Sequence, residues 1–113
     1  MNDKYILDEN GNAVAEPDLL KWAKWYESGE GRRLAIDTLS GDITVSTVFL
    51  GLDHSFCFGP PLLWETMIFG GEHDGYQERY STRQQALDGH AEAFRLANGL
   101  VAPGTGKTTG GKR

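Results

Sequence analysis

The chain has 113 residues, 39% of them hydrophobic, and a formal net charge of −5. That length suits one domain with its own core. Sixteen acidic residues lie within residues 1–100 against eight basic ones, so the body lacks the basic surface that nucleic-acid binding requires, and we expect no nucleic-acid partner. A single cysteine excludes an internal disulfide, and no segment approaches the roughly 18 apolar residues of a membrane span, so we expect a cytosolic protein without membrane contact.

The first thirty residues predict a hairpin followed by a helix. Asn10-Gly11 indicates a tight turn between two short strands, because both residues tolerate a positive φ. Pro17 suits the first turn of a helix, which we expect over residues 17–28. Apolar side chains recur there at helical spacing and should be buried: Leu19, Trp22, Ala23 and Tyr26.

The middle of the chain has the period of β-structure. Segments 32–39 and 42–50 are rich in Ile, Leu, Val and Thr and flank a turn at residues 40–42. Segment 62–69 predicts a third strand of this sheet, and "YQERY" at residues 76–80 predicts a short fourth one. Alternation places one set of side chains on a common face of the second strand: Ile43, Val45, Thr47 and Phe49.

A second helix is expected over residues 82–98. Ser81 and Gln84 match a capping box, and Gly99 suits a left-handed helix stop. The apolar stripe of this helix comprises Leu87, His90, Ala91, Phe94 and Ala97.

The order ββαββββα, with short turns between consecutive strands, implies an antiparallel sheet. We therefore predict a single α+β domain over residues 1–100, with a sheet of about four strands, an N-terminal hairpin and two helices packed on one face.

The C-terminal "VAPGTGKTTGGKR" looks like a phosphate-binding loop. Gly106, Lys107 and Thr108 supply the end of the G-x-x-x-x-G-K-[ST] pattern, but Val101 stands where its first glycine belongs. No strand is predicted before this segment, and too few residues follow it for a helix. We interpret residues 101–113 as a flexible tail and expect no cofactor.

Histidine and cysteine positions argue against catalysis and metal binding. His90 lies on the apolar stripe of the last helix, where a packing role is expected. His54 and His73 lie in loops at opposite ends of strand 62–69, and eight residues of strand separate its ends by roughly 25 Å, so they should not share a metal ion. Cys57 has no adjacent base, and its neighbours in the sequence are apolar, which favours a thiol that packs in the core. We therefore name no catalytic and no metal-binding residue.

Glu65 is unusual because it lies in the middle of an apolar strand. It is either exposed or paired, with Arg79 or Arg33 as its counter-charge. The alternative is a polar pocket on an open sheet face, which would collect Asp53, His54, Glu65, Arg79 and Tyr80.

Aromatic residues supply the candidates for an interface. Trp25 lies at the margin of the first helix stripe, and Phe56 and Trp64 surround a proline-stiffened loop. Most aromatic residues of a small domain are buried, but those that remain exposed together mark a binding surface.

Five stretches resemble a group of small bacteriophage and prophage proteins with no assigned activity: "YILDENG", "EPDLLKWAKW", "VSTVFLGLDH", "LLWETMIFGG" and "ERYSTRQQALDGH". The resemblance spans residues 5–95 and implies a phage accessory protein in the cytosol of a bacterial host.

Three hypotheses follow. The first is a non-enzymatic protein that binds a host protein, with antagonism of a bacterial defence system as an example. The second is a small-molecule or nucleotide-binding protein with a polar pocket on the sheet face, including a hydrolytic variant. The third is a structural phage component, for which a homodimer or another symmetric oligomer is expected.

Overall fold

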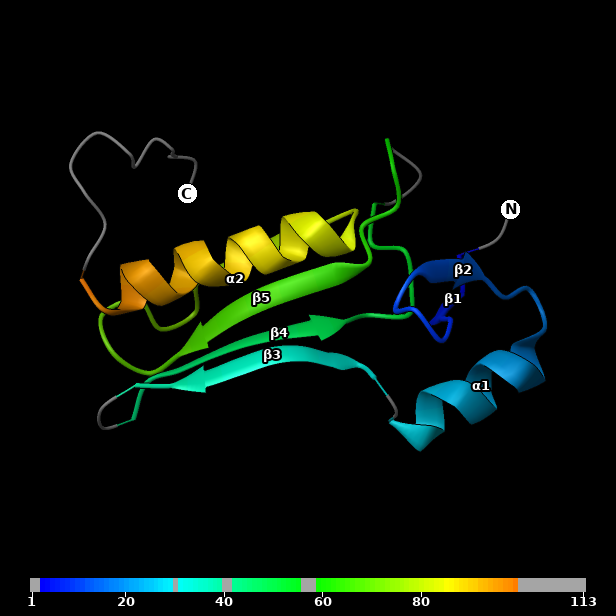
Figure 1. Cartoon of the computed structure of the whole chain (residues 1–113), viewed down its shortest axis with the longest axis horizontal. Coiled ribbons are helices and arrows are strands. Elements are labelled where there is room, and N and C mark those ends of the chain that lie inside the picture. The colour runs from blue at the N-terminus through cyan, green and yellow to red at the C-terminus, as the bar shows by residue number, and fades with distance from the viewer. Residues whose placement is uncertain (1–2, 30, 40–41, 56–58, 100–113) are drawn as a thin grey trace.

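The computed structural model describes residues 3–29, 31–39, 42–55 and 59–99. Six strands and two helices follow one another in the predicted order (Figure 1). Their bounds are β1 Tyr5–Leu7, β2 Ala13–Ala15, α1 Leu19–Ser28, β3 Arg33–Thr38, β4 Thr44–Phe49, β5 Trp64–Phe69, β6 Gln77–Tyr80 and α2 Arg83–Ala97.

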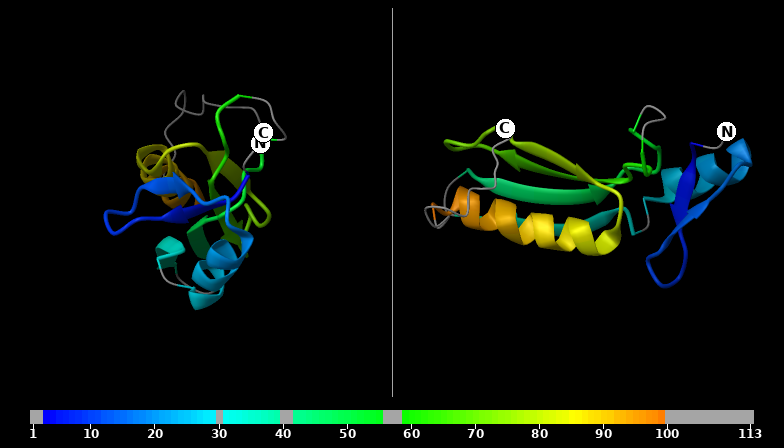
Figure 2. Two further views of the ribbon diagram at one scale, coloured as in Figure 1. Left: turned by 90° about the vertical axis from the view of Figure 1, so that its right-hand side faces the viewer. Right: turned by 90° about the horizontal axis from the view of Figure 1, so that it is seen from above.

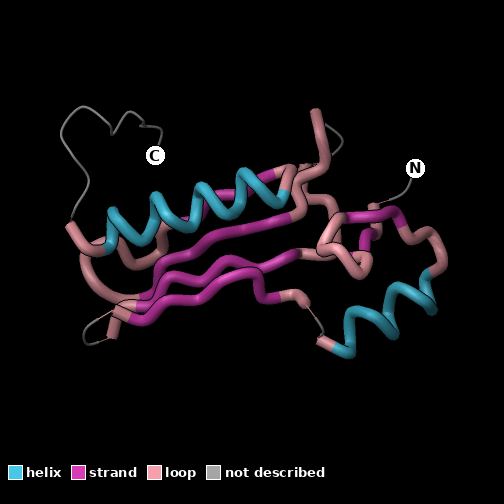
Figure 3. The backbone as a smooth tube through the Cα atoms, in the orientation of Figure 1, coloured by secondary structure: helices cyan, strands magenta, loops and turns pink. Residues whose placement is uncertain are grey.

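The main sheet has the strand order β3-β4-β5-β6, and each neighbouring pair is antiparallel (Figure 3). Strands β1 and β2 form a separate hairpin. In the main sheet Thr47 pairs with Thr66 on one face, and Glu65 pairs with Arg79 on the other. This register determines which side chains lie on each face. The predicted α+β architecture, with a four-stranded antiparallel sheet and an N-terminal hairpin, is confirmed.

Helix α2 packs across one face of this sheet and contacts all four strands. It begins one residue later than expected, because the Thr82 hydroxyl accepts from the Gln85 amide while the Gln85 side chain accepts from the Thr82 amide. The predicted capping box of Ser81 and Gln84 is therefore wrong by one position. Gly99 has a φ of 73°, the left-handed conformation expected after the helix.

The inner side of α2 consists of smaller residues than predicted. Ala86, His90 and Ala93 are buried, whereas Ala91, which we expected to be buried, is exposed. Small side chains allow the helix to lie close to the sheet. The closest approach is at Gly89, where an added Cβ would overlap the ring of Tyr80.

The core has two apolar parts under α2, at opposite ends of the strands. Phe49, Leu63, Trp64 and Ala86 form one part, and Val45, Ile68 and Ala93 form the other. Three buried polar side chains lie on the same face of the sheet and helix: Thr47, Thr66 and His90.

Helix α1 and the hairpin lie at the end of the sheet (Figure 2). Two donors meet at the Gly51 carbonyl oxygen: the Tyr5 amide at 2.9 Å and Trp22 Nε1–H at 3.0 Å. We expected both helices on one face, but only α2 takes that position, while α1 contacts β1 and reaches the core through Trp25, which packs edge-on against Phe49.

Two details of α1 also differ from the prediction. The helix begins at Leu19 because the Asp18 carboxylate accepts from the amides of Leu20 and Lys21 and acts as its cap. Leu19, which we expected to be buried, is 61% exposed, so the buried stripe of this helix does not include its first turn. In the described residues neither helix is long and apolar enough to cross a bilayer.

Candidate functional site

The face of the main sheet opposite α2 is the candidate functional site. We call it the open face, and the strand register assigns it eleven side chains: Arg33, Ile36, Thr38, Thr44, Ser46, Val48, Glu65, Met67, Phe69, Gln77 and Arg79. No described helix or strand covers this face (Figure 2).

Apolar side chains occupy the centre of the open face and the end of β5. Ile36 and Phe69 are each 47% exposed, and Val48 and Met67 are half-buried between the flanking strands. Ile36, Ser46 and Met67 lie in one row across three strands, and Val48 and Phe69 lie in the two neighbouring rows. Exposed large apolar side chains on a rigid sheet are typical of a contact surface.

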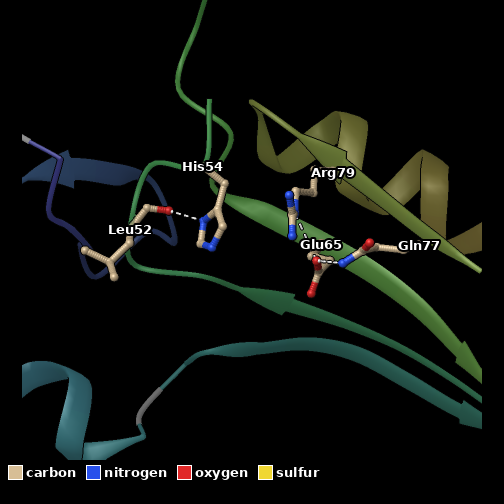
Figure 4. Close-up of polar contacts among 5 residues, drawn as sticks. All are labelled: Leu52, His54, Glu65, Gln77 and Arg79. Carbon is tan, nitrogen blue, oxygen red and sulfur yellow. Dashed lines mark hydrogen bonds and ion pairs between the residues drawn. The ribbon is translucent and has the colours of Figure 1, made fainter. Parts of the chain in front are cut away.

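A polar cluster lies beside these apolar side chains. Glu65 Oε2 accepts from Arg79 Nε at 3.0 Å and from Gln77 Nε2 at 2.5 Å (Figure 4). The Glu65 side chain is only 12% exposed and that of Arg79 is 33% exposed. Of the alternatives expected for Glu65, the structure shows the pairing with Arg79. Because this ion pair is partly desolvated, it holds both side chains in fixed positions.

The predicted polar pocket is not formed as a whole. His54 lies on the loop before β5, and its Nδ1–H donates to the Leu52 carbonyl oxygen at 2.8 Å (Figure 4). Tyr80 pairs with Trp64 and therefore faces α2, on the opposite side of the sheet from Glu65. The five residues do not line one pocket, because the sheet lies between Tyr80 and the pair of Glu65 and Arg79.

Asp53 has a local structural role. Its Oδ1 accepts from the Ser55 amide at 2.8 Å and from the Leu62 amide at 2.9 Å, which closes the loop before β5. Burial raises the pKa of Asp53, but those two amides, the Ser55 hydroxyl and the nearby His54 outweigh burial, so the pKa lies below its ordinary value.

The aromatic candidates lie away from the open face. Trp64 is 3% exposed and belongs to the core, where a partner could not contact it. Trp25 is half-buried against Phe49. Phe56, like Cys57 and the tail 101–113, lies outside the described residues.

Sequence reasoning missed a buried polar chain under α2. His90 Nε2 bonds to Asp37 Oδ2 at 2.8 Å, His90 Nδ1 to Thr47 Oγ1 at 2.7 Å, and Thr47 Oγ1 to Thr66 Oγ1 at 2.6 Å. His90 and Thr47 were each expected to face the core. The available signal was that both are polar residues on predicted inner faces and therefore need partners.

This series of hydrogen-bonded side chains has the acid–imidazole–hydroxyl order of a hydrolase triad. Because its hydroxyl groups are buried, however, we assign it a structural role. Thr47 and Thr66 have no exposed surface, so neither hydroxyl can reach a substrate. His73 lies in the turn between β5 and β6, at the end of the sheet opposite His54. Within the described ranges, no three His, Cys, Asp or Glu side chains form a metal-binding group.

Comparison with known proteins adds no further assignment. No family model matches the sequence, and no curated protein and no solved structure is significantly similar to it.

Proposed function

We propose that this protein is a binding module that docks a partner protein on the open face of its sheet. The observation that carries the proposal is the exposure of Ile36 and Phe69 on a sheet face whose opposite side is fully occupied by α2. A partner would cover these side chains and gain about 25 cal/mol for each Å² of apolar surface removed from water.

The polar cluster on the same face would provide specificity. Glu65 and Arg79 are fixed by their mutual bond, so a partner meets them in one arrangement. These two side chains therefore lose little conformational entropy when the partner binds. A partner without matching polar groups would remove this ion pair from water without replacing its contacts with water, which is costly.

The resemblance to phage proteins suggests the kind of partner. A phage accessory protein acts in the host cytosol, so the partner is a bacterial protein, and antagonism of a defence component is one role of this kind. The acidic body, with sixteen acids among residues 1–100, favours a partner surface that is neutral or basic.

Affinity capture with matched variants tests the proposal. The wild-type protein, an Ile36→Asp/Phe69→Asp variant and a Leu20→Asp control serve as baits in lysate of a bacterial host. Leu20 is 77% exposed on α1 and lies outside the open face. The control variant therefore also replaces an exposed apolar side chain with aspartate, but on another surface. We expect one stoichiometric bacterial protein on the wild type and the control, and none on the double variant.

Two results would count against the proposal. Retention of the same protein by the double variant, with its thermal midpoint preserved, would place the contact elsewhere. A wild-type protein that captures nothing and has a native mass of two copies would show that the face serves self-association instead.

A further inference from the structure

A cavity of about 650 Å³ lies at the end of the molecule where the hairpin meets the main sheet. Its wall combines the β1–β2 turn with residues of α1, β3, β5 and the first turn of α2. The volume is in the range of small-molecule sites. Of the described residues that line the cavity, only Arg33, opposite Val48, also belongs to the open face, and the rest of the lining lies outside that face.

Two arginines from different elements line this cavity. Arg33 begins β3, and Arg83 is the first residue of α2. Among the described residues neither guanidinium has a hydrogen-bond or ion-pair partner, whereas Arg79 and Arg95 are each bonded to a glutamate. Two guanidinium groups on one cavity, neither bonded to another described residue, form a site suited to phosphate, which accepts several N–H donors at once.

The hairpin turn holds Arg83 beside the cavity. Gly11 has a φ of 82°, and a Cβ at that position would stand 3.2 Å from Arg83 Nε, so the turn passes directly against this side chain. Glycine thus serves both the turn conformation and the close approach.

Two tryptophan side chains form another part of the cavity lining. Trp25 and Trp64 both line the cavity, and both pack against Phe49 behind it, with ring-centroid distances of 5.7 Å and 5.1 Å. Trp64 is almost fully buried, so the half-buried Trp25 offers the accessible ring surface. An aromatic ring in this position provides a surface for a flat heterocycle.

The acidic residues of the turn provide acceptors on the same cavity. Asp8 Oδ1 accepts from the amides of Asn10 and Asn12, which stabilise its charge within the turn, and Glu9 is exposed. Neither acid is paired with Arg33 or Arg83 in the described structure. These carboxylates suit the hydroxyl donors of a sugar.

We propose that this cavity binds a nucleoside monophosphate. Arg33 and Arg83 take the phosphate, Trp25 stacks on the base, and the carboxylates of the turn accept from the ribose hydroxyls. This site goes beyond the protein-docking function proposed for the open face and does not depend on it.

Calorimetric titration of the full chain tests this site with AMP, GMP, CMP and UMP as ligands. Adenosine and inorganic phosphate serve as controls that each lack one half of the nucleotide. We expect at least one nucleotide to bind with a Kd below about 1 mM and to quench tryptophan fluorescence, and both controls to bind at least tenfold more weakly.

Matched arginine variants locate the site. Arg33→Gln and Arg83→Gln should each weaken nucleotide binding about tenfold, the loss of one charge-assisted contact. Arg95→Gln, an exposed arginine of α2 outside the cavity, should leave the affinity unchanged. Absence of binding by all four nucleotides would overturn the proposal, as would equal binding of inorganic phosphate alone or equal losses in the three variants at unchanged thermal midpoints.

Discussion

Thr47 and Thr66 lie opposite each other on β4 and β5, at a level of the core where apolar side chains would ordinarily meet. With the single ring proton of His90 on Nε2, each of these donors has an acceptor: Thr66 donates to Thr47, Thr47 to His90 Nδ1, and His90 Nε2–H to Asp37. The Asp37 side chain is half-exposed, so this series of hydrogen bonds ends at a carboxylate that contacts solvent. Each buried member depends on its neighbour, and removing one leaves another unsatisfied.

Thr47→Val tests this dependence, because it removes the hydroxyl and keeps the shape. It leaves Thr66 Oγ1 and His90 Nδ1 without their partner, so we expect a loss of about 1–3 kcal/mol in the free energy of unfolding. Thr44→Val, on the open face of the same strand, should change stability by less than about 0.5 kcal/mol. Urea denaturation measures both, and equal stability of the two variants would contradict a structural role for the chain.

Asp53 predicts a pH dependence. Its folded pKa lies below the value of the unfolded chain, so the unfolded chain binds the proton more readily. Its contribution to stability is therefore present above the unfolded pKa and is lost as the pH falls through the folded pKa. We expect Asp53→Asn to be about 0.5–1.5 kcal/mol less stable than the wild type at neutral pH.

That difference should disappear in acid. Below about pH 4 the wild-type carboxyl begins to take up its proton in the unfolded chain, and the two proteins should converge as the pH falls further. Urea denaturation at a series of pH values follows the difference. A gap that stays constant down to acid would show that the Asp53 charge does not stabilise the loop.

At the scale of elements, the closeness of α2 to the sheet depends on Gly89. Alanine normally stabilises the interior of a helix by about 0.5–1 kcal/mol relative to glycine. At position 89, however, an added Cβ would overlap the ring of Tyr80, and the ring or the helix must move. Because of this contact, we expect the replacement of Gly89 by alanine to lower the stability of the protein, although the same replacement in a helix usually raises it.

Gly89→Ala should accordingly destabilise the protein by about 1–3 kcal/mol, the typical cost of overpacking. Asp88→Ala, one residue earlier on the exposed side of α2, should have an effect within about 0.5 kcal/mol. Thermal unfolding monitored by circular dichroism distinguishes the two. A stabilised Gly89→Ala variant would mean that α2 does not pack this closely on β6.

The elements and their order could be predicted because local patterns determine them. Alternation placed Val45, Thr47 and Phe49 on one face, and Arg79 was one of the two counter-charges expected for Glu65. The position of α1 could not be predicted, because helical periodicity shows which side is apolar and not which surface it meets.

The site features that were missed are all non-local. The bond between Asp37 and His90 joins residues 53 positions apart, and the cavity combines the turn at Asn10-Gly11 with Arg33 and Arg83. No local pattern brings such residues together. The capping box was displaced by one residue because Ser81-Thr82 and Gln84-Gln85 offer two equivalent matches to the same pattern.

At the scale of the whole molecule, the two faces of the main sheet differ in what covers them. One is closed by α2 over an aliphatic and aromatic core with a polar chain within it. The other presents Ile36 and Phe69 beside the fixed pair of Glu65 and Arg79. The hairpin and α1 extend the molecule at one end and create the cavity there, without covering the open face (Figure 1).

The most direct test of the account is the affinity of the captured bacterial protein, once purified, for the wild type and three alanine variants. Ile36→Ala and Phe69→Ala should each raise the Kd about tenfold or more, a loss of about 1.4 kcal/mol, because each removes apolar contact area from the proposed interface. Leu20→Ala, on α1, should leave the Kd within about twofold of the wild-type value. An effect of Leu20→Ala that equals or exceeds those of Ile36→Ala and Phe69→Ala would contradict the claim that the open face of the sheet is the working surface of this protein.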